Sequence, residues 1–126
     1  MLKLLRVLPL CLLPLLISGC ATTITNLTPT RQPRNASGFY TIEAAWDTRQ
    51  QSIRPESLTP YVVVDLEAYP MRPTLGIANR WETLVPVPAD KDSINYHFKV
   101  DYKYNVLGSP KSGSKLSRGY KLTIVD

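Results

Sequence analysis

Histidine is the side chain best suited to proton transfer near neutral pH, and the sequence contains one, His97. A general base also needs a partner that orients it and a nucleophile within hydrogen-bond reach. Asp101 is four residues further on, too far for direct contact within one extended strand, and no serine stands in a nucleophile motif. We therefore expect a solvated surface histidine, no catalytic residues and no enzymatic activity.

Residues that bind metals are equally sparse. The two cysteines, Cys11 and Cys20, both lie near the N-terminus, so with a single histidine the rest of the chain lacks the ligands of a zinc site. Asp65, Asp90 and Asp92 carry oxygen ligands, but no loop spaces them as a calcium site requires. We expect no metal and no cofactor.

One candidate binding site is an aromatic residue between two charged ones, Arg80, Trp81 and Glu82. Together with the aromatic stretch that starts at Tyr96, it resembles starch-binding sandwich modules, in which aromatic faces stack on sugar rings beside polar groups. The resemblance implies a carbohydrate-binding surface. The preferred alternative is that Trp81 packs in the core, which is also the expected position of Trp46.

A second candidate site is basic and lies in the C-terminal third of the chain. Lys99 and Lys103 are four residues apart and so share one face of an extended strand, and we expect Lys121 to lie opposite them. These lysines either form a solvated sheet face that resists aggregation, or contact an anionic envelope polymer or lipid headgroups. Both interpretations can hold together.

The element that carries Lys99 and Lys103 is the most strongly patterned stretch of the sequence, residues 94–105. Apolar or aromatic residues alternate there with polar or charged ones. This period of two predicts a long strand with one buried face, which needs a sheet around it and an opposing layer.

Other segments predict the rest of that sheet and its opposing layer. We expect strands over 23–27, 38–46, 61–66, 80–87 and 117–126, and residues 67–71 either continuing the third of these or pairing back on it. Tyr40, Ile42, Ala44 and Trp46 form the better core face of the second strand. Residues 72–79 and 108–115 are expected to be loops, and both are candidate contact surfaces. Roughly seven strands without an amphipathic helix predict a single all-β, antiparallel sandwich.

Length and charge limit the possible partners. The chain has 126 residues, enough for one domain. Without residues 1–19 it keeps thirteen of its fifteen basic residues and all ten acidic ones, a net charge of +3. Because we expect the domain to lie outside the cytoplasm, nucleic acid is not an expected partner.

That location follows from the N-terminus. Lys3 and Arg6 precede a short apolar run, which predicts a cleaved signal peptide over 1–19. The sequence Leu-Ile-Ser-Gly-Cys at 16–20 resembles the lipobox of bacterial lipoproteins. The resemblance implies lipidation of Cys20, and Ala21 after it favours the outer membrane. Residues 20–37 would then form the lipidated N-terminus, first strand and tether, and 38–126 the remainder of the sandwich.

A further resemblance concerns the fold. Asp92, Ile94, Tyr96 and Phe98 alternate as in an immunoglobulin-type strand, where the tyrosine hydroxyl bonds to upstream backbone, here around 90–92. The chain is similar to a group of small bacterial lipoproteins of immunoglobulin-like fold, through residues 24–29, 69–71 and 79–88. The resemblance implies fold and location, and no activity.

Together these patterns predict a non-enzymatic, lipid-anchored envelope protein that acts as a protein-interaction or accessory module. Its expected partners are the membrane, through Cys20, and an envelope protein or polysaccharide. The alternative is a carbohydrate-binding module that uses an exposed Trp81.

Overall fold

The computed structural model describes residues 22–126. The signal peptide expected over 1–19 and the lipidation site at Cys20 lie outside the described residues. Within the described part, no helix is long and apolar enough to cross a membrane.

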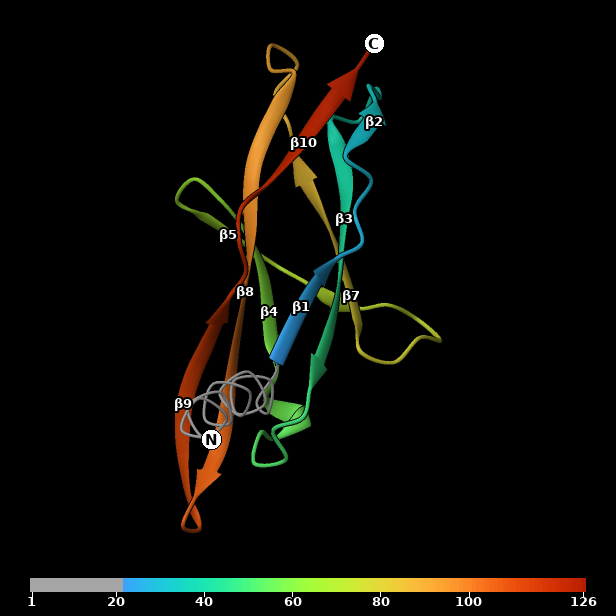
Figure 1. Ribbon diagram of the computed structural model, residues 1–126. Helices are drawn as coiled ribbons and strands as arrows, with labels where there is room; N and C mark the ends of the chain where they lie inside the picture. The colour runs from blue at the N-terminus through green and yellow to red at the C-terminus, as the bar shows by residue number, and fades with distance from the viewer. Residues whose placement is uncertain (1–21) are drawn as a thin grey trace, which may run out of the picture.

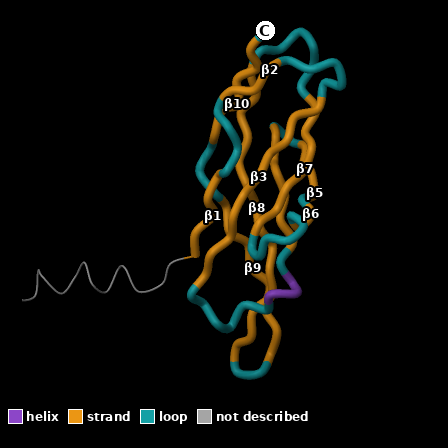
Figure 2. Tube along the Cα trace, turned by 90° about the vertical axis from the view of Figure 1, so that its right-hand side faces the viewer, coloured by secondary structure: helices purple, strands orange, loops and turns teal. Residues whose placement is uncertain are grey.

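Two β-sheets pack face to face and form an all-β sandwich (Figure 1). The first sheet contains, in spatial order, β1 (Thr22–Asn26), β3 (Phe39–Thr48), β7 (Arg80–Pro86) and β6 (Arg72–Pro73). The second sheet contains β2 (Arg31–Pro33), β10 (Tyr120–Val125), β8 (Ser93–Val106), β4 (Thr59–Val64) and β5 (Glu67–Pro70), and β9 (Ser109–Leu116) also pairs with β8. A single turn of 3₁₀ helix, η1 (Pro55–Ser57), interrupts the strands (Figure 2). The expected all-β sandwich is confirmed.

The long strand predicted over 94–105 is β8, and its alternation matches its burial. Ile94, Tyr96, Phe98 and Val100 are buried and face the first sheet. Tyr40, Ile42, Ala44 and Trp46 form the buried face of β3, also as expected. Burying an apolar side chain of this size contributes roughly 2 kcal/mol, so these facing rows supply much of the stability.

The core has two parts that meet near the middle of β8. The larger cluster includes Ile42, Val62, Val85, Phe98 and Leu122, all essentially without solvent contact. The smaller cluster contains Trp46, Ile53 and Val100 and lies toward the end of β8 that continues into β9. Because Ile53 comes from the connection between β3 and β4, this connection closes the end of the sandwich from which the β8–β9 hairpin extends.

The chain changes sheet at a proline-flanked crossing. β5 pairs back on β4 and forms one edge of the second sheet, and β6 pairs with β7 in the first sheet. The buried Met71 lies between them, and its N–H donates to the carbonyl oxygen of Pro60 at 2.9 Å. Pro70 and Pro73 thus lie on short edge strands, where a missing backbone donor costs least.

Three features differ from the expectations. The described residues form ten strands instead of roughly seven, and β2 pairs in parallel with β10. Residues 108–115 are not a loop, because 109–116 form β9 along β8. The Tyr96 hydroxyl does not bond to backbone near 90–92, but accepts a hydrogen bond from Nδ2 of Asn26 at 2.9 Å.

Candidate functional site

The candidate site with the most sequence-predicted residues is the outer face of β8 and β9. A shallow groove of about 590 Å³ lies there, and Lys99 and Lys103 both line it. Asp101 stands between them, and its carboxylate lies 3.6 Å from Nζ of Lys99. The hydroxyl of Ser114, across the strand pair, donates to the same Asp101 oxygen at 2.6 Å. The groove is therefore polar and cationic, with one carboxylate already engaged.

The backbone of this region is fixed by the segment before β4. The N–H of Arg54 donates to the carbonyl oxygen of Lys103 at 2.9 Å, and the N–H of Lys103 donates to the hydroxyl of Ser57 at 2.8 Å. Ile53 forms an isolated bridge with Tyr104. Because β9 covers the other side of β8, the base of the hairpin is held on both sides.

The β8–β9 hairpin ends in a two-residue turn, Leu107–Gly108, between the paired Val106 and Ser109. Both turn residues have positive φ, 51° at Leu107 and 78° at Gly108. Such a turn suits the twist of a hairpin but favours Asn-Gly, because an L side chain with a Cβ is strained in this region. Leu107 adopts this strained conformation although its side chain is fully exposed and therefore gains little from packing.

Lys121 does not join the other two lysines. It pairs with Asn95 on β8, four residues before Lys99, so the two lysines lie about 13 Å apart along the strand. The structure thus brings Lys99 and Lys103 together and leaves Lys121 near the opposite end of the same outer face.

Arg80, Trp81 and Glu82 also separate, because neighbouring residues of a strand point to opposite faces. Trp81 pairs with the buried Ala44 and packs against both core clusters. Arg80 and Glu82 lie on the outer face, where Arg80 contacts Glu43 at 3.2 Å. A sugar platform needs an exposed flat indole, and the half-buried Trp81 does not present one.

His97 lies on the outer face of β8, opposite Val63 of β4, and is partly buried there. Among residues 22–126, no three His, Cys, Asp or Glu side chains lie close enough together to hold a metal ion.

A second hollow, of about 440 Å³, opens between the two sheets beside the β4–β5 hairpin. Its lining is mainly apolar and includes Phe39, Val64, Tyr69 and Val87. Phe39 is about half exposed, and Leu66 at the neighbouring hairpin turn is fully exposed. Because Phe39 begins β3 and Thr48 ends it, this cleft and the pairing of Thr22 with Thr48 lie at opposite ends of the sandwich.

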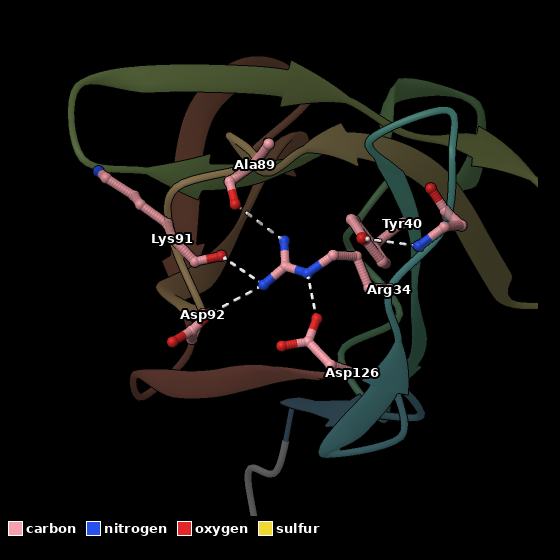
Figure 3. A network of polar contacts seen from close by, with 7 residues as sticks. Arg34, Tyr40, Ala89, Lys91, Asp92 and Asp126 are labelled. Carbon is pink, nitrogen blue, oxygen red and sulfur yellow. Dashed lines mark hydrogen bonds and ion pairs between the residues drawn. The ribbon is translucent and has the colours of Figure 1, made fainter.

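Sequence reasoning missed a polar network at the cleft end, centred on Arg34 (Figure 3). Its guanidinium donates to carboxylate oxygens of Asp126 at 2.6 Å and Asp92 at 2.8 Å, and to the carbonyl oxygens of Ala89 and Lys91. The hydrogen bond to Asp126 raises the pKa of Arg34 above its ordinary value. No sequence signal links residues so far apart in the chain.

No protein-family model matches the chain, and the search of curated proteins found no significant relative.

Proposed function

We propose that the protein is a non-enzymatic, lipid-anchored module of the bacterial envelope with an immunoglobulin-like sandwich, held in the outer membrane by an acyl group on Cys20. The observation that supports the anchor most directly is the sequence Leu-Ile-Ser-Gly-Cys at 16–20, which resembles a lipobox. β1 begins at Thr22, so one residue separates the lipidation site from a paired strand. A tether this short keeps the end of the sandwich at which β1 begins close to the membrane.

The proposed contact surface for an envelope protein partner is the apolar cleft at the other end of the sandwich. Half-exposed Phe39 and fully exposed Leu66 lie beside it, and exposed apolar side chains next to a hollow are typical of protein contact sites. This cleft faces away from the tethered end, where a partner has free access.

Lipid attachment is tested by metabolic labelling with palmitate in a bacterium that matures lipoproteins. The full chain is expected to incorporate label and to fractionate with membranes. Cys20→Ala is expected to lose both properties, while Cys11→Ala keeps them because that residue lies in the expected signal peptide. An unlabelled, soluble wild-type chain would contradict the anchor.

The partner surface is tested with a photo-crosslinking amino acid in intact cells. Placed at Phe39, it is expected to give a discrete protein adduct. The matched control is Arg49, which is also exposed but lies at the tethered end. No adduct from position 39, or equal adducts from both, would remove the cleft as the contact surface.

A further inference from the structure

The β8–β9 hairpin extends past the end of the sandwich as an arm (Figure 1). Among residues 22–126, its outer part pairs with itself and with the short segment around Ser52–Arg54, where the N–H of Asn105 donates to the carbonyl oxygen of Ser52 at 3.0 Å. The paired strands of the first sheet, β1, β3, β7 and β6, form no ladder with it.

The tip of the arm is apolar and exposed. Val106 is 40% exposed and Leu107 is fully exposed. Among residues 22–126, the other non-glycine residues with positive φ are Asp65 and Asn79. Aspartate and asparagine tolerate this conformation, whereas leucine does not. Neither burial nor turn geometry explains leucine at this position.

The net positive charge of residues 20–126 lies along the β8–β9 arm. Residues 99–116 contain four lysines and one aspartate, a net charge of +3. The remainder of 20–126 contains nine basic and nine acidic residues, so its net charge is zero. An exposed apolar tip with lysines behind it is a combination of side chains that settles at the interface of an anionic membrane.

The arm also lies at the end where the chain enters the fold. The hydroxyls of Thr22 and Thr48 are 2.8 Å apart, and the N–H of Gln50 donates to the Thr48 hydroxyl at 3.1 Å. Three residues later Ile53 bridges to Tyr104 of the arm. In Figure 1, β1 starts in the half of the sandwich nearer the arm and runs away from it, and the C-terminus lies at the opposite end. In the sequence, one residue separates Cys20 from Thr22.

We propose that the tip of the β8–β9 arm, Leu107 with Val106 and the lysines 103 and 111, contacts the anionic headgroups of the membrane that holds the lipid on Cys20. This inference rests on the proposed anchor. The arm is a second contact point, so the domain stands on the bilayer in one orientation instead of turning freely about its tether.

The test uses the full chain with Leu107→Cys, purified in detergent after maturation and labelled with an environment-sensitive fluorophore. Because acylation occupies Cys20, the new thiol is the one available for labelling. The matched controls are Leu66→Cys and Leu75→Cys, whose leucines are as exposed but lie on other turns. Each protein is reconstituted into vesicles with or without phosphatidylglycerol, and flotation reports how much is anchored.

On phosphatidylglycerol vesicles, the label at 107 is expected to shift to the blue and to be quenched by nitroxide lipids, and labels at 66 and 75 are not. Serine at both 103 and 111 is expected to weaken the contact strongly, since each lysine near an anionic surface contributes about fivefold. Salt at about 0.5 M should have the same effect because it screens exposed charges. Neither change is expected to alter flotation.

Failure of the arm and failure of the anchor give different results. Protein that floats while its 107 label stays as exposed to water as the 75 label overturns the arm contact and leaves the anchor standing. Protein that does not float overturns the anchor and the arm contact together. Quenching at 107 that is equal on vesicles without phosphatidylglycerol overturns the role of the lysines.

Discussion

The side chain of Ser117 replaces a missing backbone partner of Phe98. The N–H of Phe98 donates to the Ser117 hydroxyl at 2.8 Å, and the N–H of Ser117 donates to the carbonyl oxygen of Phe98 at 2.9 Å. β8 changes partner at this point: Lys99 pairs with Leu116 of β9, and Tyr96 pairs with Tyr120 of β10. Between these two pairs, the segment that joins β9 to β10 has one residue more than β8, and the extra residue forms a bulge. The strand bends here toward the arm, and Phe98 keeps its backbone hydrogen bonds.

The first prediction concerns this bulge. Ser117→Ala removes the acceptor of a buried N–H and is expected to lower the free energy of unfolding by about 1–3 kcal/mol. Urea unfolding followed by tryptophan fluorescence measures the change. Ser117→Thr keeps a hydroxyl and is expected to restore most of the loss, and Ser112→Ala, on the exposed part of β9, is the neutral control. Equal stability of the Ser117 and Ser112 alanine variants would contradict the role of the hydroxyl.

The second prediction concerns the strained turn. Leu107→Asn is expected to raise the free energy of unfolding by about 0.5–1 kcal/mol, because asparagine tolerates positive φ and the exposed leucine loses no packing. Leu66→Asn is the matched control, since Leu66 is fully exposed without positive φ. If the variant is no more stable than wild type, leucine is not strained there. A stabilised variant that no longer contacts membranes would show that leucine is kept for contact.

The third prediction separates the two interpretations of Trp81. Because its indole packs against both core clusters, Trp81→Ala is expected to cost about 2 kcal/mol or more in chemical unfolding. Phe39→Ala, which removes a half-exposed ring, is expected to cost much less. Wild-type protein is not expected to sediment with insoluble polysaccharides. Sedimentation lost in a fully stable Trp81→Ala would instead support the carbohydrate-binding alternative.

The fourth prediction concerns Arg34. Arg34→Ala is expected to lower the melting temperature and to speed amide exchange where β2 meets β10, at the bond from Thr123 N–H to the carbonyl oxygen of Thr30. Arg34→Lys is not expected to rescue this, because one ammonium group cannot reproduce the planar fork that reaches several acceptors. Unchanged exchange in β2 and β10 would remove the structural role.

Because Arg34 stays charged up to strongly alkaline pH, its contribution to the stability of the fold is expected not to change between neutral and moderately alkaline pH. Its pKa is raised above its ordinary value in the folded state, so the stabilisation is fully present below the pKa of the unfolded chain and is lost only as the pH rises through the pKa of the folded protein. The difference in melting temperature between wild type and Arg34→Ala is therefore expected to stay constant from about pH 7 to about pH 10. A difference that disappears within that range would contradict the assignment.

Local pattern alone was enough to predict the main strands. In β8 and β3 every second residue is apolar, and because side chains alternate across a strand, this pattern fixed which face is buried without knowledge of any partner. The same alternation could have separated Trp81 from Arg80 and Glu82. Residue counts also predict no zinc site, because the chain has a single histidine and both cysteines lie near the N-terminus.

Tertiary structure decided what local pattern could not. β9 is rich in Ser, Gly and Lys, residues with little strand preference, and it is a strand because β8 offers it a row of hydrogen-bonding partners. The bond between Asn26 and Tyr96 and the network of Arg34 join residues far apart in sequence. The arm could not be predicted from the sequence for the same reason. Residues 99–116 show their charge in the sequence, but only the pairing of β8 with β9 gathers that charge behind one exposed tip, at the end of the sandwich where the chain begins.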